Sequence, residues 1–145
     1  SFNELLKFLR EQKSLLAATP SIWPVRGWVT SEFGVRKNPF SSGREFHKGI
    51  DIASRSGKEI IVPADGFVLE VAYRSDDGNV VKIDHGYGVS TSYAHLSKAA
   101  VKEGVGVKRG DVIGYVGNTG RSTGVHLHYG VIVNDIPVNP RKYLK

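Results

Sequence analysis

Turn-forming residues recur through most of this 145-residue chain and limit what it can fold into. It contains 17 glycines, without the one-in-three period of collagen. They separate short runs that are rich in β-branched and aromatic residues, which favour strands. Glycine permits tight turns that other residues adopt only at a cost. The pattern therefore favours a domain of short strands over a helical bundle.

Eight runs after residue 27 have the composition of β-strands. Gly, Pro, Asn and Asp residues lie between them and predict tight turns. The expected strands are 28–35, 49–53, 59–62, 66–73, 79–84, 89–94, 111–116 and 128–133. We expect a mainly β, antiparallel sandwich or barrel with long loops at one end.

The first 20 residues instead follow a helical pattern that stops at Thr19-Pro20. The apolar positions on this pattern are Phe2, Leu5, Leu6, Leu9 and Leu16. A helix of about four turns is marginal alone in water, so it must dock on the domain or join a coiled coil. We favour the end of a truncated coiled coil. The chain then divides into a helical lead, residues 1–20, and a domain, residues 21–145.

Composition excludes several classes of protein. The absence of Cys rules out disulfides, thiolate zinc sites and cysteine nucleophiles. The net charge of +6 is spread along the chain with acids between, which favours a solvated basic surface over nucleic-acid binding. An anionic polymer partner stays open. No apolar run has membrane-spanning length, so we expect membrane attachment only through an anchor upstream of residue 1.

Four of the five histidines stand in patterns that suit metal chemistry. His47 and Asp51 are four residues apart, which returns both side chains to one face of a strand. His126 and His128 share a face only in an extended strand, with the residue between them in the core. His95 ends a strand-like run. Imidazole nitrogen and carboxylate oxygen suit Zn²⁺, and three protein ligands with one open position define a catalytic zinc site.

Simpler explanations exist for each pair, namely a surface salt bridge for His47 with Asp51 and an exposed strand face for His126 with His128. They leave unexplained the flanking glycines, which would let backbone or substrate approach closely. These glycines are Gly117, Gly120, Gly124 and Gly130.

Three further polar residues have expected roles of their own. His85, in a hairpin-like turn, is expected to form structural hydrogen bonds. We expect Arg36 and Arg44 to be solvated surface residues, with binding of substrate carboxylates as the alternative.

The three motifs together, and in this order, resemble the signatures of the M23 zinc metallopeptidases. The strings are Phe46–Ile52, Tyr93–Leu96 and Gly120–Tyr129, within a likeness that covers residues 23–140. The family includes lysostaphin-like and LytM-domain peptidoglycan endopeptidases. The resemblance implies a β-sheet groove of the LytM type, a duplicated hybrid motif, over residues 21–145. It also implies Zn²⁺ as cofactor and hydrolysis of peptide bonds in bacterial cell-wall peptides.

Carried over residue by residue, the resemblance assigns the metal to His47, Asp51 and His128 and makes His95 and His126 the catalytic histidines. Zinc lowers the pKa of a bound water toward about 7 and polarises the scissile carbonyl. One catalytic histidine would take the proton of water and the other would stabilise the oxyanion. The sequence does not assign the two roles. We give the general-base role to His126, because its neighbour on the strand face is a ligand.

Two departures from the family pattern affect supporting residues. The acidic residue that often follows the HxH-aromatic segment is Gly130 here, which puts support of a ligand in doubt. Residues 41–46 also lack the tyrosine that some lysostaphin-like members supply before the first ligand.

Two other functions compete with an endopeptidase. A noncatalytic LytM-like module would bind and activate a cell-wall amidase, but such modules lack ligands that are all present here. A lipoyl or biotinyl carrier needs a lysine at a hairpin tip, where Lys108 is poorly placed. We therefore expect an enzyme of the bacterial cell envelope, periplasmic or extracellular. Its partners would be peptidoglycan peptides and, through the helix, an envelope regulatory protein, with no nucleic acid.

Overall fold

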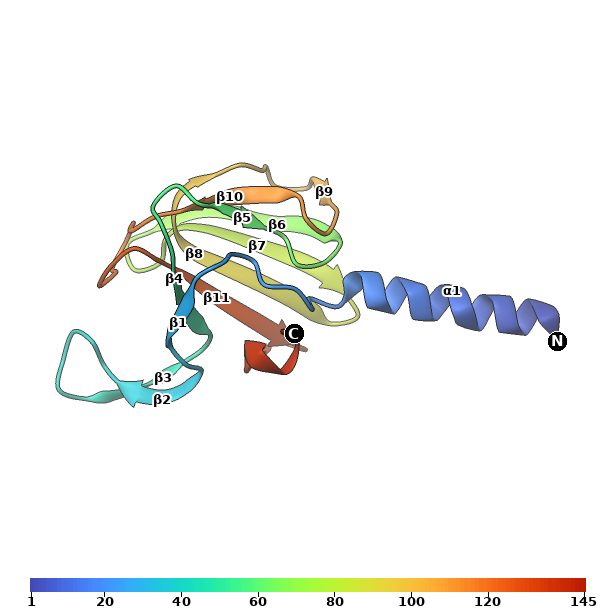
Figure 1. Ribbon diagram of the computed structural model, residues 1–145, viewed down its shortest axis with the longest axis horizontal. Coiled ribbons are helices and arrows are strands. Elements are labelled where there is room, and N and C mark those ends of the chain that lie inside the picture. The colour runs from blue at the N-terminus through green and yellow to red at the C-terminus, as the bar shows by residue number, and fades with distance from the viewer.

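Two antiparallel sheets form the framework of the chain, which the computed structural model describes over residues 1–145 (Figure 1). The larger sheet has ten strands in the order β1-β4-β11-β8-β7-β6-β9, with β10 joining β8 to β5 and β12 beside β11. Its strands are β1 (Trp28–Ser31), β4 (Ile50–Ala53), β5 (Glu59–Ile61), β6 (Gly66–Arg74), β7 (Gly78–Gly86), β8 (Val89–Ala99), β9 (Gly106–Val107), β10 (Val112–Val116), β11 (His126–Val133) and β12 (Ile136–Val138). The expectation of a mainly β, antiparallel fold is confirmed.

The second sheet is a hairpin of β2 (Gly34–Lys37) and β3 (Arg44–His47) that extends from the main sheet (Figure 1). The prediction of a single strand over residues 28–35 was wrong. Two strands lie in this region, because β1 pairs with β4 whereas β2 pairs with β3. The predictions also missed β3, β9 and β12. These strands are short, and β3 carries charged residues, so their pairing partners rather than their own composition make them strands.

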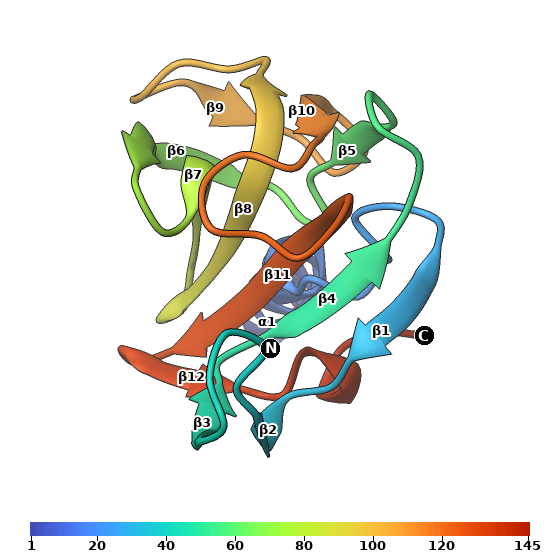
Figure 2. The ribbon, with the colours of Figure 1, turned by 90° about the vertical axis from the view of Figure 1, so that its left-hand side faces the viewer.

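A cluster of 16 buried residues forms the core of the main sheet. Ile50, Ile52 and Leu127 are fully buried on β4 and β11. Burial of one such side chain contributes about 1.5–3 kcal/mol. Figure 2 shows β4, β11 and β8 side by side in the middle of the domain. The core therefore fixes the three strands whose other face carries the site.

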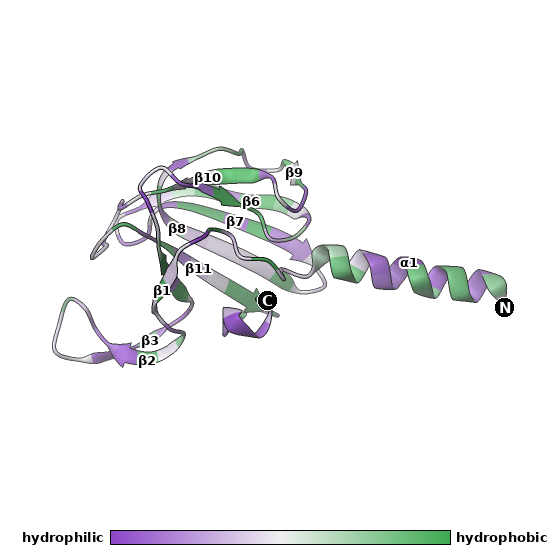
Figure 3. Cartoon of the chain, viewed as in Figure 1, coloured by the Kyte–Doolittle hydropathy of each residue, from purple (hydrophilic) through white to green (hydrophobic).

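Helix α1 (Phe2–Ala18) extends away from the sheets. A capping box between Ser1 and Glu4 begins it, and the Arg109 guanidinium donates to the carbonyls of Leu16 and Thr19 at its end, at 2.7 and 3.0 Å. Figure 3 shows hydrophobic segments along α1 outside the domain, and Ala18 is its one buried residue. α1 therefore contacts the domain at its C-terminal end and not along its whole length. No helix here is both long and apolar enough to cross a bilayer.

A 3₁₀ turn, η1 (Pro140–Lys142), follows β12 near the C-terminus. The Asn139 side chain accepts from the backbone N–H of Arg141 and caps this turn.

Candidate metal centre

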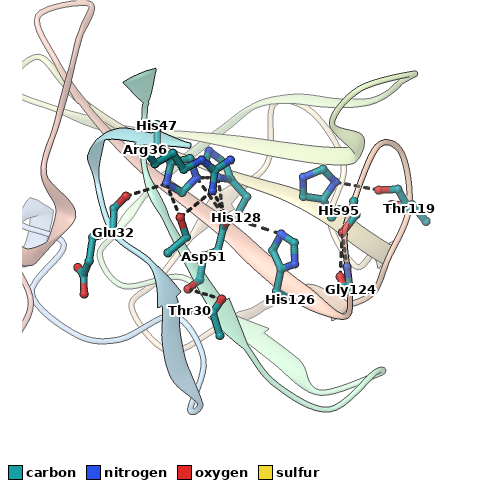
Figure 4. Close-up of polar contacts among 12 residues, drawn as sticks. Thr30, Glu32, Arg36, His47, Asp51, His95, Thr119, Gly124, His126 and His128 are labelled. Carbon is teal, nitrogen blue, oxygen red and sulfur yellow. Dashed lines mark hydrogen bonds and ion pairs between the residues drawn. The ribbon is translucent and has the colours of Figure 1, made fainter. Parts of the chain in front are cut away.

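Three ligand-type side chains meet where β3, β4 and β11 come together (Figure 4). Nε2 of His47 lies 3.2 Å from Asp51 Oδ1 and 3.2 Å from His128 Nδ1. His128 Nδ1 lies 2.9 Å from Asp51 Oδ1. The register of β4 with β11 sets His128 opposite Asp51. Because His126 and His128 alternate with the fully buried Leu127, both imidazoles lie on the groove side of β11, as their spacing predicts.

The hydrogen-bond partners of these ligands favour a cation between them. Nδ1 of His47 lies 2.9 Å from the carbonyl oxygen of Glu32, which can only accept, so Nδ1 carries the hydrogen. Nε2 of the neutral ring is then an acceptor that faces a second acceptor, Asp51 Oδ1. Atoms held at about 2.0–2.1 Å from a tetrahedral zinc are about 3.3 Å apart, close to the spacing here. The donor set therefore fits zinc.

The charge state of Asp51 also suits a metal. Burial by itself would raise its pKa, but the close imidazole nitrogens of His128 and His47 outweigh burial and hold the pKa well below its usual range. The carboxyl group is thus ionised at neutral pH. A buried carboxylate beside two imidazole nitrogens is a ligand set that zinc accepts without thiolates.

His126 and His95 lie beside the ligands but outside the group of three donor atoms. Nε2 of His126 is 3.8 Å from Asp51 Oδ1. The ring centroid of His95 is 5.3 Å from that of His126 and 6.4 Å from that of His128. Burial lowers the pKa of His126, and the nearby His95 and His128 add to this against the opposing attraction of Asp51. His126 is therefore neutral at pH 7 and able to accept a proton.

The backbone places His95 in the groove through an unusual conformation. Its φ is +65°, which is sparsely populated for a residue other than glycine, and its N–H donates to the Asp77 carbonyl at 2.7 Å. Nδ1 of the ring lies 2.8 Å from the Thr119 carbonyl oxygen and must be its donor. Gly120 is needed next to Thr119, because a Cβ there would lie 2.3 Å from the Gly78 nitrogen. The loop before β11 thus fixes the tautomer of His95.

Arg36 is a site residue that the sequence prediction missed. A solvated surface arginine was expected, but Nη1 of Arg36 donates to Asp51 Oδ2 at 3.0 Å and to Ser31 Oγ at 2.7 Å. No local signal identifies this contact, because it depends on how the β2–β3 hairpin folds over β4.

His85 lies outside the site and is fully hydrogen-bonded. Nδ1 faces the Asp65 carbonyl oxygen at 2.8 Å, and Nε2 faces Thr91 Oγ1 at 2.7 Å. Thr91 Oγ1 in turn lies 2.6 Å from the Tyr93 hydroxyl. Burial lowers the pKa of His85. The structural role expected from the sequence agrees with these contacts.

All five predicted site residues line one groove with a volume of about 570 Å³. Its lining is mostly polar and charged, with Asp76 and Asp77 from the β6–β7 turn and Lys37 from the hairpin. The Arg121 guanidinium stacks 4.2 Å above the ring centroid of Phe40, so two loops meet at the groove. Such a groove can hold an extended, charged peptide over the ligand set.

An open groove with one carboxylate, two imidazole donors and two further histidines is typical of a metal-dependent hydrolase. Peptidase family M23 matches residues 45–140. The chain belongs to this family.

Several known proteins that are similar to this chain in sequence or in structure are also peptidases. The chain is 46% identical over 112 residues to the DD-carboxypeptidase/endopeptidase Mpg of Neisseria meningitidis serogroup B, covering 77% of this chain and 26% of Mpg. It is 43% identical over 115 residues to the peptidoglycan DD-endopeptidase ShyA of Vibrio cholerae, covering 79% and 27%. The crystal structure of a zinc-containing peptidase from Vibrio cholerae superposes with a TM-score of 0.76 at 39% identity, covering 81% of this chain and 37% of that chain. The chain spans about a quarter of the length of these two curated relatives.

Proposed function

We propose that this domain is a zinc-dependent endopeptidase that hydrolyses peptide bonds in the stem or cross-link peptides of bacterial peptidoglycan. The observation that carries the proposal is the donor set of His47, Asp51 and His128, with two histidines left free beside it. Relatives named as peptidoglycan endopeptidases support the substrate class. The enzyme would then work in the cell envelope, in the periplasm or outside the cell.

His47, Asp51 and His128 would hold the zinc ion. When bound, zinc lowers the pKa of a water molecule and polarises the scissile carbonyl. Glu32 fixes the tautomer of His47 through its backbone carbonyl, so that Nε2 is available as a ligand without loss of a proton.

His126 would act as general base. Its lowered pKa keeps the ring neutral at pH 7, which is the state that a base requires. It also stands next to the donor set, with Nε2 3.8 Å from Asp51 Oδ1. Proton transfer by a positioned histidine typically accelerates a reaction by about 10²–10⁴-fold.

His95 would be the donor that stabilises the developing oxyanion. Its Nδ1–H is committed to the Thr119 carbonyl, so Nε2 is the ring nitrogen that remains for substrate, and it would donate to the oxyanion in the doubly protonated, imidazolium form of the ring. The contact also holds the ring in one orientation, and a preorganised donor costs no reorganisation during the reaction.

Isolated sacculi provide the direct test of this function. Zinc-loaded protein is incubated with sacculi that carry direct cross-links between stem peptides and with sacculi that carry glycine bridges, and released fragments are identified by mass. Cleaved peptide bonds in one type support the proposal and identify the bond. Intact peptides in both, together with stimulation of an amidase added to the sacculi, would favour the noncatalytic module instead.

We also propose that residues 1–20 are the end of a coiled coil through which an envelope partner binds the domain. Leu5, Leu9 and Leu16 of α1 are each more than half exposed, at 52, 52 and 68%. The hydrogen bonds that Arg109 donates to the end of α1 support a fixed direction of the helix relative to the domain. If these exposed leucines pair with the same helix of another copy, the protein should self-associate at high concentration, as measured by analytical ultracentrifugation. Replacing Leu5 and Leu9 by Ser should abolish this association. A wild-type chain that stays monomeric would contradict pairing of the helix between copies of this chain.

A further inference from the structure

Arg36 joins three elements around the carboxylate of Asp51. From β2, Nη1 donates to Asp51 Oδ2 on β4 at 3.0 Å and to Ser31 Oγ on β1 at 2.7 Å. Nε donates to Glu45 Oε1 on β3 at 3.1 Å, in the register that sets Arg36 opposite Glu45. The Arg36 side chain is about three-quarters buried, with an exposure of 26%. It is thus held on several sides in one orientation.

The two oxygens of Asp51 have separate partners. Oδ1 faces the nitrogens of His47 and His128, whereas Oδ2 faces Arg36 (Figure 4). A carboxylate can hold a metal through one oxygen or through both. The ion pair with Arg36 occupies Oδ2 and fixes the rotation of the carboxylate plane.

We propose that Arg36 is a positioning residue that restricts Asp51 to binding the metal through Oδ1 alone. The inference rests on the proposed function for the presence of the metal. A catalytic zinc site needs a position that the protein leaves open, and a second oxygen from Asp51 would compete for it. Arg36 therefore keeps the ligand count at three.

Glu45 makes this arrangement compatible with a nearby cation. A lone guanidinium beside the ligands would repel a divalent metal, but Glu45 offsets the charge of Arg36 through their ion pair. Arg36, Glu45 and Asp51 together carry one net negative charge. Arg36 can then orient the carboxylate while the ligand set stays attractive to zinc.

The test uses cobalt-substituted protein, because the absorption bands of Co²⁺ report the number and geometry of its ligands. Arg36→Met removes the donor to Oδ2, and Arg36→Lys keeps a charge but lacks the planar fork that reaches several acceptors. Arg44→Met, at an exposed arginine of the same hairpin, is the matched control. Zinc affinity is measured by competition with a chelator, and the folding of each metal-free variant is checked by its melting temperature.

We expect Arg36→Met to change the cobalt spectrum and to weaken zinc binding by roughly 10–100-fold, as loss of a residue that orients a ligand typically does. Arg36→Lys should fall between Met and wild type, and Arg44→Met should match wild type. If Arg36→Met does not fold, the cobalt spectrum and zinc affinity of Arg36→Lys test the proposal instead. A folded Arg36→Met with the wild-type spectrum and affinity would overturn the proposal, as would an Arg36→Lys identical to wild type. Both readouts are independent of peptide hydrolysis, so a protein that binds zinc without cutting peptidoglycan would refute only the proposed function.

Discussion

His128 Nδ1 lies 2.9 Å from Asp51 Oδ1 although 77 residues separate them in the chain. Antiparallel pairing of β11 with β4 sets the two residues directly opposite each other. On one face of such a pair, opposite side chains have Cβ atoms about 4.5–5.5 Å apart, which lets their tips converge. The proposed ligand set is therefore a consequence of strand register, and a shift of one residue would destroy it.

Removal of one ligand should release the metal. Purified protein should contain about one zinc per chain, and His128→Ala should contain little, because two remaining ligands hold zinc weakly. Metal analysis by mass spectrometry checks this. His85→Gln is the control, since His85 is a buried histidine outside the site and its replacement should leave zinc bound. Full zinc in His128→Ala would disprove the ligand assignment.

His95 should matter for catalysis and not for metal binding. Because its ring lies outside the donor set, His95→Ala should retain zinc while hydrolysis falls by about 10²–10⁴-fold. The rate of release of peptidoglycan fragments and the zinc content are measured on the same sample. A variant that keeps its activity would remove His95 from the mechanism.

Acid should abolish activity at a pH below the ordinary histidine value. Burial lowers the pKa of His126, so the proposed general base becomes protonated only below about 6.5, where protons would also compete with zinc for the proposed ligands. The rate should therefore be steady from pH 8 to about 6.5 and fall below that. Rates and zinc content measured in parallel separate protonation of the base from loss of metal. A constant rate down to pH 5 would contradict both causes.

The pH dependence of stability should include a contribution from His85. Since burial lowers its pKa in the folded state, the unfolded chain binds the proton first, and stability falls as the pH drops below about 6.5. Nε2 of the neutral ring accepts a hydrogen bond from the Thr91 hydroxyl, and protonation at Nε2 would break this bond. Urea unfolding of metal-free wild type and His85→Gln at pH 7 and pH 5 tests this. The wild type should lose more stability, by up to about 1.4 kcal/mol per pH unit. Equal losses would assign the pH dependence to other groups.

Gly49 immediately precedes β4 and lets this strand, which carries Asp51, lie close to β11. A Cβ at this position would lie 2.3 Å from the Tyr129 carbonyl oxygen and 3.1 Å from Cε1 of His128. Gly49→Ala should therefore cost about 1–3 kcal/mol of unfolding free energy and also weaken zinc binding, because His128 must move. Gly43→Ala is the control, since a Cβ there meets only Ser41 Oγ at 3.7 Å. Unfolding in urea and chelator competition measure the two effects, and a Gly49→Ala variant as stable as Gly43→Ala would refute the steric argument.

The local spacing of residues was enough to predict much of the fold and the site. Alternation along a strand is a property of the backbone itself, so it predicted that His126 and His128 face one way and that Leu127 is buried. The glycines similarly predicted short strands and tight turns. The absence of cysteine confined any zinc site to imidazole and carboxylate ligands. These inferences need only neighbouring residues.

Only the tertiary structure decided which distant segments meet. The chain breaks between β1 and β2 because β1 pairs with β4 whereas β2 pairs with β3. This break places the β2–β3 hairpin so that Arg36 reaches Asp51. The tautomer of His95 depends on a carbonyl 24 positions away, at Thr119. Such contacts have no local signal, because packing of the whole sheet selects them. The sequence therefore determined the chemical types in the site, and strand pairing determined their geometry and the residues that support them.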